Sequence, residues 1–133
     1  MTIVCDKDRC RWRAGLCPPF RGSVCPFGGG AITYKAESAP AAVDAKAIAE
    51  IYNVDLGYET DEKQIFDRLG KIDENREAVF VAETDGEVIG ALHIEKYSTL
   101  YYKDIANILS LAVRGKYRRG GVGKALVSAA ENW

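Results

Sequence analysis

The sequence lacks any apolar segment of the about 20 residues that a membrane-spanning helix needs, so no such helix is expected. Its first residues have neither a basic region nor a long apolar stretch, and a secretion signal is therefore not expected. The formal net charge is only -1, which argues against a protein whose whole surface binds nucleic acid. These absences predict one domain of ordinary composition, located in the cytoplasm.

Cysteine is absent after residue 25. All four cysteines share the first 30 residues with three of the four prolines and a run of three glycines at 28–30. This uneven composition predicts an appendage at residues 1–30, followed by a domain at residues 31–133, with the glycine run as a linker. Disulfides are not expected in a reducing compartment. The cysteines are Cys5, Cys10, Cys17 and Cys25.

The cysteine spacing leaves two interpretations open. The pattern C-x4-C-x6-C-x7-C matches no standard zinc site, which uses close cysteine pairs. Part of it resembles a worn ferredoxin motif for an iron–sulfur cluster, in which Arg13 stands where a cysteine belongs and Cys5 would supply the fourth thiolate. The alternative is a set of free thiols on a flexible appendage. We assign no residue to a metal site.

From residue 31 onward, hydrophobic periodicity predicts regular elements. An N-cap is predicted at Thr60, and the pair Asp85-Gly86 predicts the tight turn of a hairpin. The apolar stripe Ile65, Phe66 and Leu69 is assigned to the core. In chain order we expect a strand (32–36), a helix (from 40 to near 57), a helix (60–72), two strands (78–83 and 88–97), a strand (108–113) and a helix (from 122).

The last part of the chain contains no Asp or Glu between Asp104 and Glu131. An apolar run at 108–113, typical of a buried strand, is followed by a glycine-rich turn and a helical pattern from Val122. Glycines let the backbone approach a ligand, and the free N–H groups of a helix N-terminus favour an anion. The stretch therefore predicts a phosphate or pyrophosphate site. Its cations are Arg114, Lys116, Arg118, Arg119 and Lys124.

Two common phosphate-binding motifs do not fit this stretch. A Walker loop would need glycine at position 118 and a hydroxyl residue after Lys124, where the chain has Arg118 and Ala125. A dinucleotide fingerprint that begins at Gly121 would need glycine at position 126, where Leu126 stands. Both classes of nucleotide site are therefore excluded.

The pattern that fits is Arg118-x-x-Gly121-x-Gly123, preceded by Tyr117 and by a strand that ends at residues 111–113. It resembles motif A (Q/R-x-x-G-x-G/A) of the GNAT family of N-acetyltransferases. The hairpin phrase at 79–90 is also typical of that family, although less specific. The resemblance covers residues 32–133, about three quarters of the chain.

The resemblance implies an α/β fold, the acyl-CoA N-acyltransferase fold, with a mixed α+β sheet and the order β-α-α-β-β-β-α. It implies an N-acetyltransferase that moves the acetyl group of acetyl-CoA to a small-molecule or peptide amine, by direct attack of the amine on the thioester. It also implies a set of residues that bind the cofactor. They are Leu111, Ala112, Val113, Arg118, Arg119, Gly120, Gly121, Val122, Gly123 and Lys124.

Family members usually continue past this helix with a further strand, a helix and two strands, whereas this chain ends at Trp133. We therefore expect either a fragment of a longer product or a half-domain that another chain completes. An exposed strand edge at 108–113 invites such pairing, and a homodimer that completes the sheet is one form of it.

No catalytic residue is assigned. An ammonium must lose a proton before it attacks, and the candidate groups are His93, Glu95 and Asn107. The amide of Asn107 cannot take a proton, Glu95 is expected to be solvated, and His93 is expected to be half-buried with its hydrogen bonds satisfied. Backbone donors for the oxyanion are expected from a distorted strand near 111–113. Three tyrosines either line the acceptor site or cover a loop: Tyr97, Tyr101 and Tyr102.

Two other classes of function stay open. A nucleic-acid-binding module would use the basic residues at 114–124 and would lose affinity steeply with salt, although the net charge makes nucleic acid a poor candidate. A metal- or iron–sulfur-bearing interaction or redox protein would carry only a vestigial acetyl-CoA site.

Overall fold

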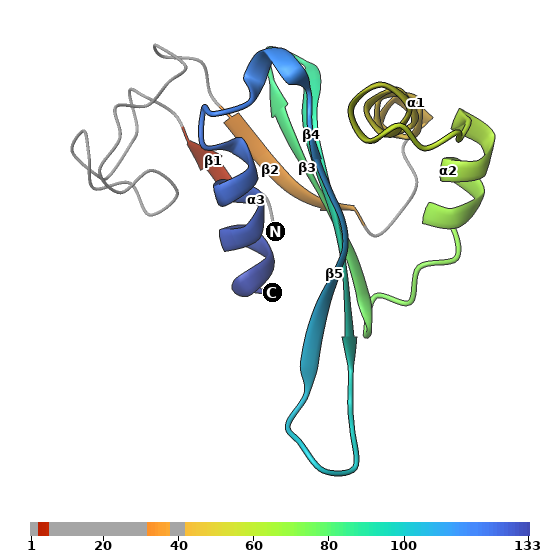
Figure 1. The fold of residues 1–133 in the computed structure, drawn as a ribbon, viewed down its shortest axis with the longest axis vertical. Coiled ribbons are helices and arrows are strands. Elements are labelled where there is room, and N and C mark those ends of the chain that lie inside the picture. Colours follow the sequence, from red (N-terminus) through yellow and green to blue (C-terminus); the bar gives the residue numbers. More distant parts are fainter. Residues whose placement is uncertain (1–2, 6–31, 38–41) are drawn as a thin grey trace.

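The computed structural model describes residues 3–5, 32–37 and 42–133, with side chains from residue 44 onward. Its centre is a five-stranded sheet in the order β1-β2-β3-β4-β5, and all four neighbouring pairs are antiparallel. Two helices, α1 and α2, cover one face of the sheet, and α3 covers the other (Figure 1). The α/β fold class is confirmed, and so is the expected element order from residue 32 onward.

The elements follow one another in sequence order along the chain. They are β1 (Ile3–Cys5), β2 (Ile32–Glu37), α1 (Ala42–Ile51), the π-helical turn η2 (Tyr52–Leu56), α2 (Glu62–Leu69), β3 (Glu77–Thr84), β4 (Glu87–Tyr97), β5 (Ile105–Val113), the 3₁₀ turn η3 (Gly115–Tyr117) and α3 (Val122–Glu131).

The first strand was not anticipated from the sequence. β1 pairs with β2 through three residue pairs, from Ile3 with Tyr34 to Cys5 with Ile32. The division into an appendage at 1–30 and a domain at 31–133 stays a prediction, because most of the first segment lies outside the described residues. The same holds for the metal and free-thiol hypotheses, since no cysteine side chain is described.

The hairpin between β3 and β4 forms where the sequence predicts it. Asp85 and Gly86 have φ values of 50° and 75°, and two successive positive values are typical of the tight turn that suits twisted strands. A register shift follows in β4, where the pairing changes between Ala82 and Glu83 of β3. This turn explains why the Asp-Gly pair located the hairpin so closely.

The sheet is buried on both faces, and residues alternate between two cores along β3 and β4. Phe80, Leu92 and their neighbours pack against α3, while Val81 and Ala91 pack against α1 and α2. Gly90 lies under α3, where a Cβ would come 3.1 Å from both the Ala112 carbonyl oxygen and Leu126 Cδ1. A glycine at this position therefore lets α3 lie close to the sheet.

Three local predictions on α1 and α2 had different outcomes. The first helical segment ends as expected, with Gly57 at φ 73°. The N-cap of α2 is Asp61, whose Oδ1 accepts from Gln64 N at 2.7 Å, so the prediction of Thr60 is wrong by one residue. The assignment of Phe66 to the core is also wrong, since its ring is exposed. Pro40, the expected start of α1, lies outside the described residues.

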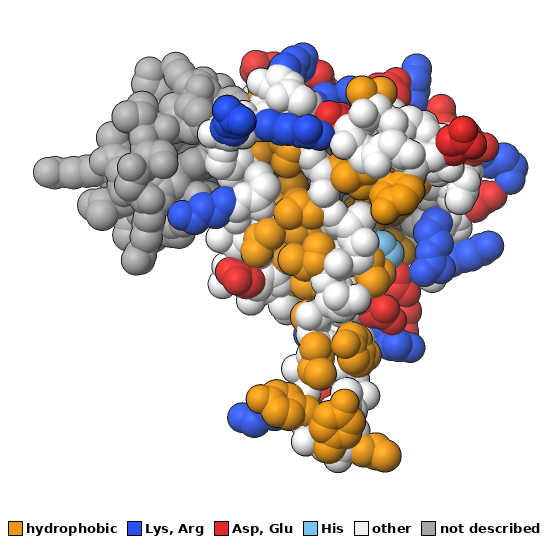
Figure 2. Space-filling model, viewed as in Figure 1, with side chains coloured by type: hydrophobic (Ala, Val, Ile, Leu, Met, Phe, Trp, Pro, Cys, Tyr) orange, Lys and Arg blue, Asp and Glu red, His pale blue; other side chains and the backbone are white. Residues whose placement is uncertain are grey.

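β5 is a strand as predicted, but the expectation that it is buried is wrong. It is the last strand in the sheet, so the expected exposed edge is present among the described strands, and three of its apolar side chains are exposed. The β4–β5 hairpin extends well beyond the rest of the sheet (Figure 1). Hydrophobic side chains gather at its tip (Figure 2). Leu100, Tyr101 and Tyr102 are exposed, so within the described part of the chain Tyr101 and Tyr102 cover no loop. The exposed β5 residues are Ile108, Leu109 and Leu111.

None of the helices in the described ranges is both long enough and apolar enough to cross a membrane.

Candidate functional site

The basic loop (residues 114–123) joins β5 to α3 and bends sharply just before the helix. Arg119 and Gly121 have φ values of 62° and 85°, and Gly121 is the N-cap of α3, with no side chain capping the helix. The first helical hydrogen bond runs from Ala125 N to Gly121 O at 3.0 Å. The N–H groups of residues 122–124 therefore point out of the helix end, where the helix dipole favours an anion.

A pocket of about 300 Å³ lies in front of this helix end. It brings together seven of the ten residues that the family resemblance implies for cofactor binding. They are Val113, Arg118, Arg119, Gly121, Val122, Gly123 and Lys124, and Tyr117 joins them. Ala112 differs, because its side chain is buried in the core under α1. Leu111 and Gly120 do not line the pocket: Gly120 lies between two lining residues in sequence, and Leu111 lies two residues before Val113.

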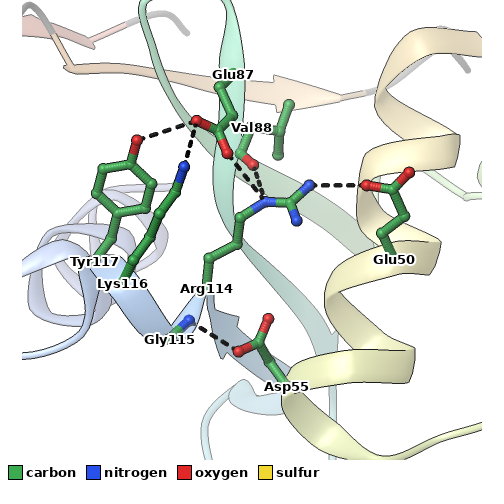
Figure 3. A network of polar contacts seen from close by, with 8 residues as sticks. All are labelled: Glu50, Asp55, Glu87, Val88, Arg114, Gly115, Lys116 and Tyr117. Carbon is green, nitrogen blue, oxygen red and sulfur yellow. Dashed lines mark hydrogen bonds and ion pairs between the residues drawn. The ribbon is translucent and has the colours of Figure 1, made fainter.

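Three of the five cations in this region bind acids from elsewhere in the chain, although the segment itself contains no acid. Arg114 Nη2 lies 3.1 Å from Glu50 of α1, and Lys116 Nζ lies 3.0 Å from Glu87 of β4 (Figure 3). Arg118 Nη2 lies 3.3 Å from Asp55. Among the described residues, Arg119 and Lys124 are in no ion pair, and both line the pocket.

Glu87 collects several donors from the basic loop. Lys116 Nζ and the Tyr117 hydroxyl each donate to its Oε2 at 3.0 Å, and Arg114 Nε lies 3.7 Å from its Oε1. The hydrogen bond from Lys116 is the largest cause that lowers the pKa of Glu87, against a smaller rise from desolvation. Glu87 therefore stays ionised and ties the loop to the start of β4.

Asp55 of η2 fixes the other side of the loop. Its Oδ1 accepts from Gly115 N at 2.9 Å, and its carbonyl oxygen accepts from Arg118 Nη2 at 3.1 Å. Arg118 Nε also donates to Val113 O at 3.1 Å. The guanidinium of Arg118 lines the pocket but is already bonded to protein groups, so it shapes the loop.

The outer edge of β5 presents backbone groups next to the pocket. Arg114 N donates to Ile89 O across the sheet at 2.9 Å. Because backbone groups alternate in direction along a strand, those of Leu111 and Val113 point away from β4. The bond from Arg118 to Val113 O, which lies on that outer side, agrees with this direction. The edge therefore offers both backbone groups of Leu111 and the N–H of Val113.

A second feature of β5 is a register shift at Leu109. His93 of β4 pairs with Ser110, whereas the next residue of β4, Ile94, pairs with Ile108, so Leu109 is the extra residue. The sequence places the distortion of this strand near 111–113, two or more residues too late. A bulge of this kind bends a strand and redirects its backbone groups.

The three candidate bases lie on one face of the sheet, the face that α1 and α2 partly cover. His93 pairs with Ser110, and Glu95 pairs with Asn107, across the β4–β5 ladder. His93 Nε2 lies 3.0 Å from Glu77 Oε2, so the prediction of a satisfied histidine is confirmed. Glu95 is not simply solvated, because Arg76 Nη2 lies 3.1 Å from its Oε1.

Single-sequence reasoning missed the partners of these groups. Tyr52 of η2 places its hydroxyl 2.6 Å from Ser110 Oγ, and burial raises the pKa of this phenol more than the Ser110 hydrogen bond lowers it. Glu77, Asp55 and Glu87 were also missed. Each lies far in sequence from the residue that it binds, and no local spacing signals such a contact.

The sequence model of the Acetyltransferase (GNAT) family matches residues 45–133, more than half of the chain. No curated protein gives a match to the sequence. The fold resembles several solved structures. A GNAT family acetyltransferase from Staphylococcus aureus is 21% identical with a TM-score of 0.67, and 76% of each chain is covered.

Two further solved structures resemble the chain to a similar degree. An aminoglycoside acetyltransferase from an uncultured soil metagenomic sample is 22% identical with a TM-score of 0.59, covering 76% of this chain and 68% of that one. A ribosomal-protein-alanine N-acetyltransferase from Brucella melitensis biovar Abortus 2308 is 16% identical with a TM-score of 0.59, covering 76% of this chain and 70% of that one. At these identities the likeness shows the fold.

The sheet, its covering helices and the loop before α3 define an acetyltransferase-type α/β domain. The family match makes the assignment specific: the chain belongs to the GNAT family of acetyltransferases. Enzymes of this family use acetyl-CoA as cosubstrate. The alternative functions gain no support. The basic loop is largely neutralised, and the described residues hold no group of three or more metal-ligating side chains.

Proposed function

We propose that the chain transfers the acetyl group of acetyl-CoA to an amine by direct attack of the amine on the thioester. The observation that carries the proposal is the pocket at the uncapped N-terminus of α3, beside the outward-facing edge of β5. An anion fits the first feature, and an extended amide chain fits the second. The pyrophosphate and the pantetheine arm of CoA combine these two chemistries.

The pyrophosphate is proposed to bind the backbone N–H groups of residues 119–124. Arg119 and Lys124 are the two of the five cations at 114–124 that are in no ion pair among the described residues, and they add attraction that solvent screens. Arg114, Lys116 and Arg118 act differently, because their bonds to Glu50, Glu87 and Asp55 hold the loop in shape. The anion is thus bound mainly by a preformed backbone surface.

The pantetheine arm is proposed to pair with the outer edge of β5. Val113 contributes its N–H, because its carbonyl oxygen already accepts from Arg118, and Leu111 contributes both backbone groups. With the phosphates at the loop, the arm runs from Val113 back towards Ser110. Its thioester end then lies near the bulge at Leu109, where redirected backbone N–H groups can face a developing oxyanion.

The acceptor is proposed to be a small-molecule or peptide amine. The amine has to be held in line with the thioester carbonyl, and such positioning alone supplies on the order of 7 kcal/mol of the barrier. The named relatives act on an aminoglycoside and on a ribosomal protein, so the family resemblance does not choose between the two kinds of acceptor. Both kinds present an amine that must lose a proton.

A calorimetric titration with CoA tests the proposed site. A Cβ at Gly123 would lie 3.9 Å from Val113 Cγ2, an ordinary contact, so Gly123→Ala should fold normally. The added methyl group faces the pocket, however, and would displace an anion from several N–H groups together. We expect affinity for CoA to fall about ten- to a hundredfold.

Ser128→Ala serves as the control, because Ser128 lies in the same helix and outside the pocket. This variant should bind CoA like the wild type. Equal affinities for the wild type and Gly123→Ala would show that the pocket is not the CoA site. Absence of binding by the wild type would contradict the proposed function as a whole.

A further inference from the structure

We propose that His93 accepts the proton of the attacking amine and that Glu77 fixes the tautomer in which it does so. The inference rests on the proposed function and deepens it by giving the reaction a catalytic base. It starts from a pair of groups that the binding of CoA does not use. His93 is the only histidine of the chain, and its side chain is 16% exposed.

The position of His93 in the sheet is the first argument. His93 is the register partner of Ser110, so the two side chains are neighbours on the same face, with Cβ atoms about 5 Å apart. An arm that pairs with Val113 and Leu111 reaches Ser110 next. The imidazole therefore lies on β4, the strand next to β5, at the level at which the thioester ends on the outer side of β5.

The carboxylate of Glu77 is the second argument. It lies 3.0 Å from His93 Nε2 and is itself only 15% exposed. A carboxylate at this nitrogen keeps a proton on Nε2, which leaves the lone pair of Nδ1 as the acceptor. Arg68 Nη2 lies 3.6 Å from Glu77 Oε2, so the carboxylate lies between this cation and the imidazole. In other enzymes, a base that activates a nucleophile is oriented by a hydrogen bond to a third group, and the pair of His93 and Glu77 has this arrangement.

The remaining polar groups on this face are poorer bases. Asn107 has no titratable proton acceptor, and Glu95 is in an ion pair with Arg76. Tyr52 and Ser110 bond to each other at 2.6 Å, and burial keeps the phenol protonated. Among the described groups that face His93, only the imidazole combines a carboxylate orienter with a nitrogen left to accept.

The proposed step balances as follows. The ammonium of the acceptor gives one proton to His93 Nδ1, and the neutral nitrogen attacks the carbonyl carbon of the thioester. A carbon–nitrogen bond forms, the carbon–sulfur bond breaks, and CoA leaves as a thiolate. The second proton of the nitrogen passes to the thiolate, and His93 returns its proton to water.

The test measures release of the CoA thiol from acetyl-CoA, as a function of pH, with spermidine and with an alanine-terminated peptide as acceptors. His93→Gln should lower kcat by about 10²- to 10⁴-fold while leaving the affinity for CoA unchanged. It should also change the dependence of kcat on pH, because glutamine cannot accept the proton. Glu77→Gln should cause a smaller loss, since a glutamine still bonds to the ring and does not fix one tautomer.

Glu95→Gln tests the other candidate base on this face, and this variant should keep the wild-type pH profile. The inference is overturned if His93→Gln retains the rate and the profile, or if Glu95→Gln loses them instead. Urea unfolding and CoA titration of each variant separate a lost base from a lost fold. A wild-type chain that acetylates neither amine would refute the proposed transfer itself, and this inference with it.

Discussion

Arg118 and Asp55 lie 63 positions apart in the sequence, and their side chains meet at 3.3 Å. The contact joins the π-helical turn η2 to the basic loop, and Gly115 N adds a bond to the same carboxylate oxygen. Figure 3 shows that the bonds of Arg114 and Glu87 hold the same part of the loop to α1 and β4. The arginine of the family motif therefore belongs to the framework of the site.

Removal of the Asp55 carboxylate should loosen this framework. The carboxylate is 8% exposed whereas Arg118 is 53% exposed, so the ion pair with Arg118 contributes little and the bond from Gly115 N contributes more. Asp55→Ala should lower the free energy of unfolding by about 1.5–3 kcal/mol, measured in urea. Asp55→Asn keeps an acceptor at the same place and should lose less. Equal losses in the two variants would contradict this account.

Gly90→Ala tests the close approach of α3 to the sheet. The new methyl group would meet Ala112 O and Leu126 Cδ1 at 3.1 Å and Val122 Cγ1 at 3.2 Å. Because a backbone oxygen and a packed helix cannot both move away, we expect a loss of about 1–3 kcal/mol in the free energy of unfolding. Gly123→Ala is the control, since the same change there meets no close atom. A Gly90→Ala variant as stable as the control would show that α3 shifts freely.

The sequence predicted those parts of the fold that depend on local signals. The Asp85-Gly86 pair located a hairpin because positive φ values are needed there and few residues adopt them easily. The helical stripe of α3 and the glycine turn before it were predicted for similar reasons. The cap of α2 was misplaced by one residue, because Thr60 and Asp61 are both good N-cap residues and local propensity does not separate them.

What the sequence could not predict depends on contacts between distant segments. The five cations at 114–124 have no acid near them in sequence, yet Glu50, Asp55 and Glu87 reach three of them through the fold. The apolar run in β5 resembles a buried strand, because its period alone does not reveal an edge position; the exposed edge was expected only from the family resemblance. Both failures concern partners, which periodicity does not encode.

Deletion of residues 2–30 tests the predicted boundary between appendage and domain. The described part of that segment pairs with β2 through only three residue pairs, at one end of the sheet. We expect the free energy of unfolding to fall by no more than about 1–2 kcal/mol, because the described residues of the segment contribute few hydrogen bonds. A chelator added to the full chain serves as the companion measurement. A loss of folding on deletion, or a marked drop in Tm with the chelator, would show that the segment carries a structural metal or part of the core.

Glu87 should make stability fall in acid. The hydrogen bond from Lys116 is the largest cause that lowers the pKa of Glu87 below the ordinary 4.5. The hydrogen bond from Tyr117 and the charge of Arg114 lower it further. A carboxylate whose folded pKa is lowered contributes fully above pH 4.5, and the contribution disappears as the pH falls from there through the lowered value. Glu87→Gln should therefore be less stable than the wild type at pH 7 and equally stable once Glu87 is protonated. Since Glu87 is partly exposed, the difference at pH 7 should not exceed about 1 kcal/mol.

The ion pair between Lys116 and Glu87 should also weaken at high pH. The bond to Glu87 raises the pKa of Lys116 above its ordinary 10.5, so the interaction is fully present below pH 10.5 and is lost as the pH rises through the raised value. Urea unfolding between pH 3 and 11 should thus give a plateau in the difference between wild type and Glu87→Gln, with losses at both ends. Glu59→Gln, an exposed acid in no ion pair among the described residues, should give no such plateau. A difference between wild type and Glu87→Gln that persists at pH 3 would show that Glu87 acts through its shape and not its charge.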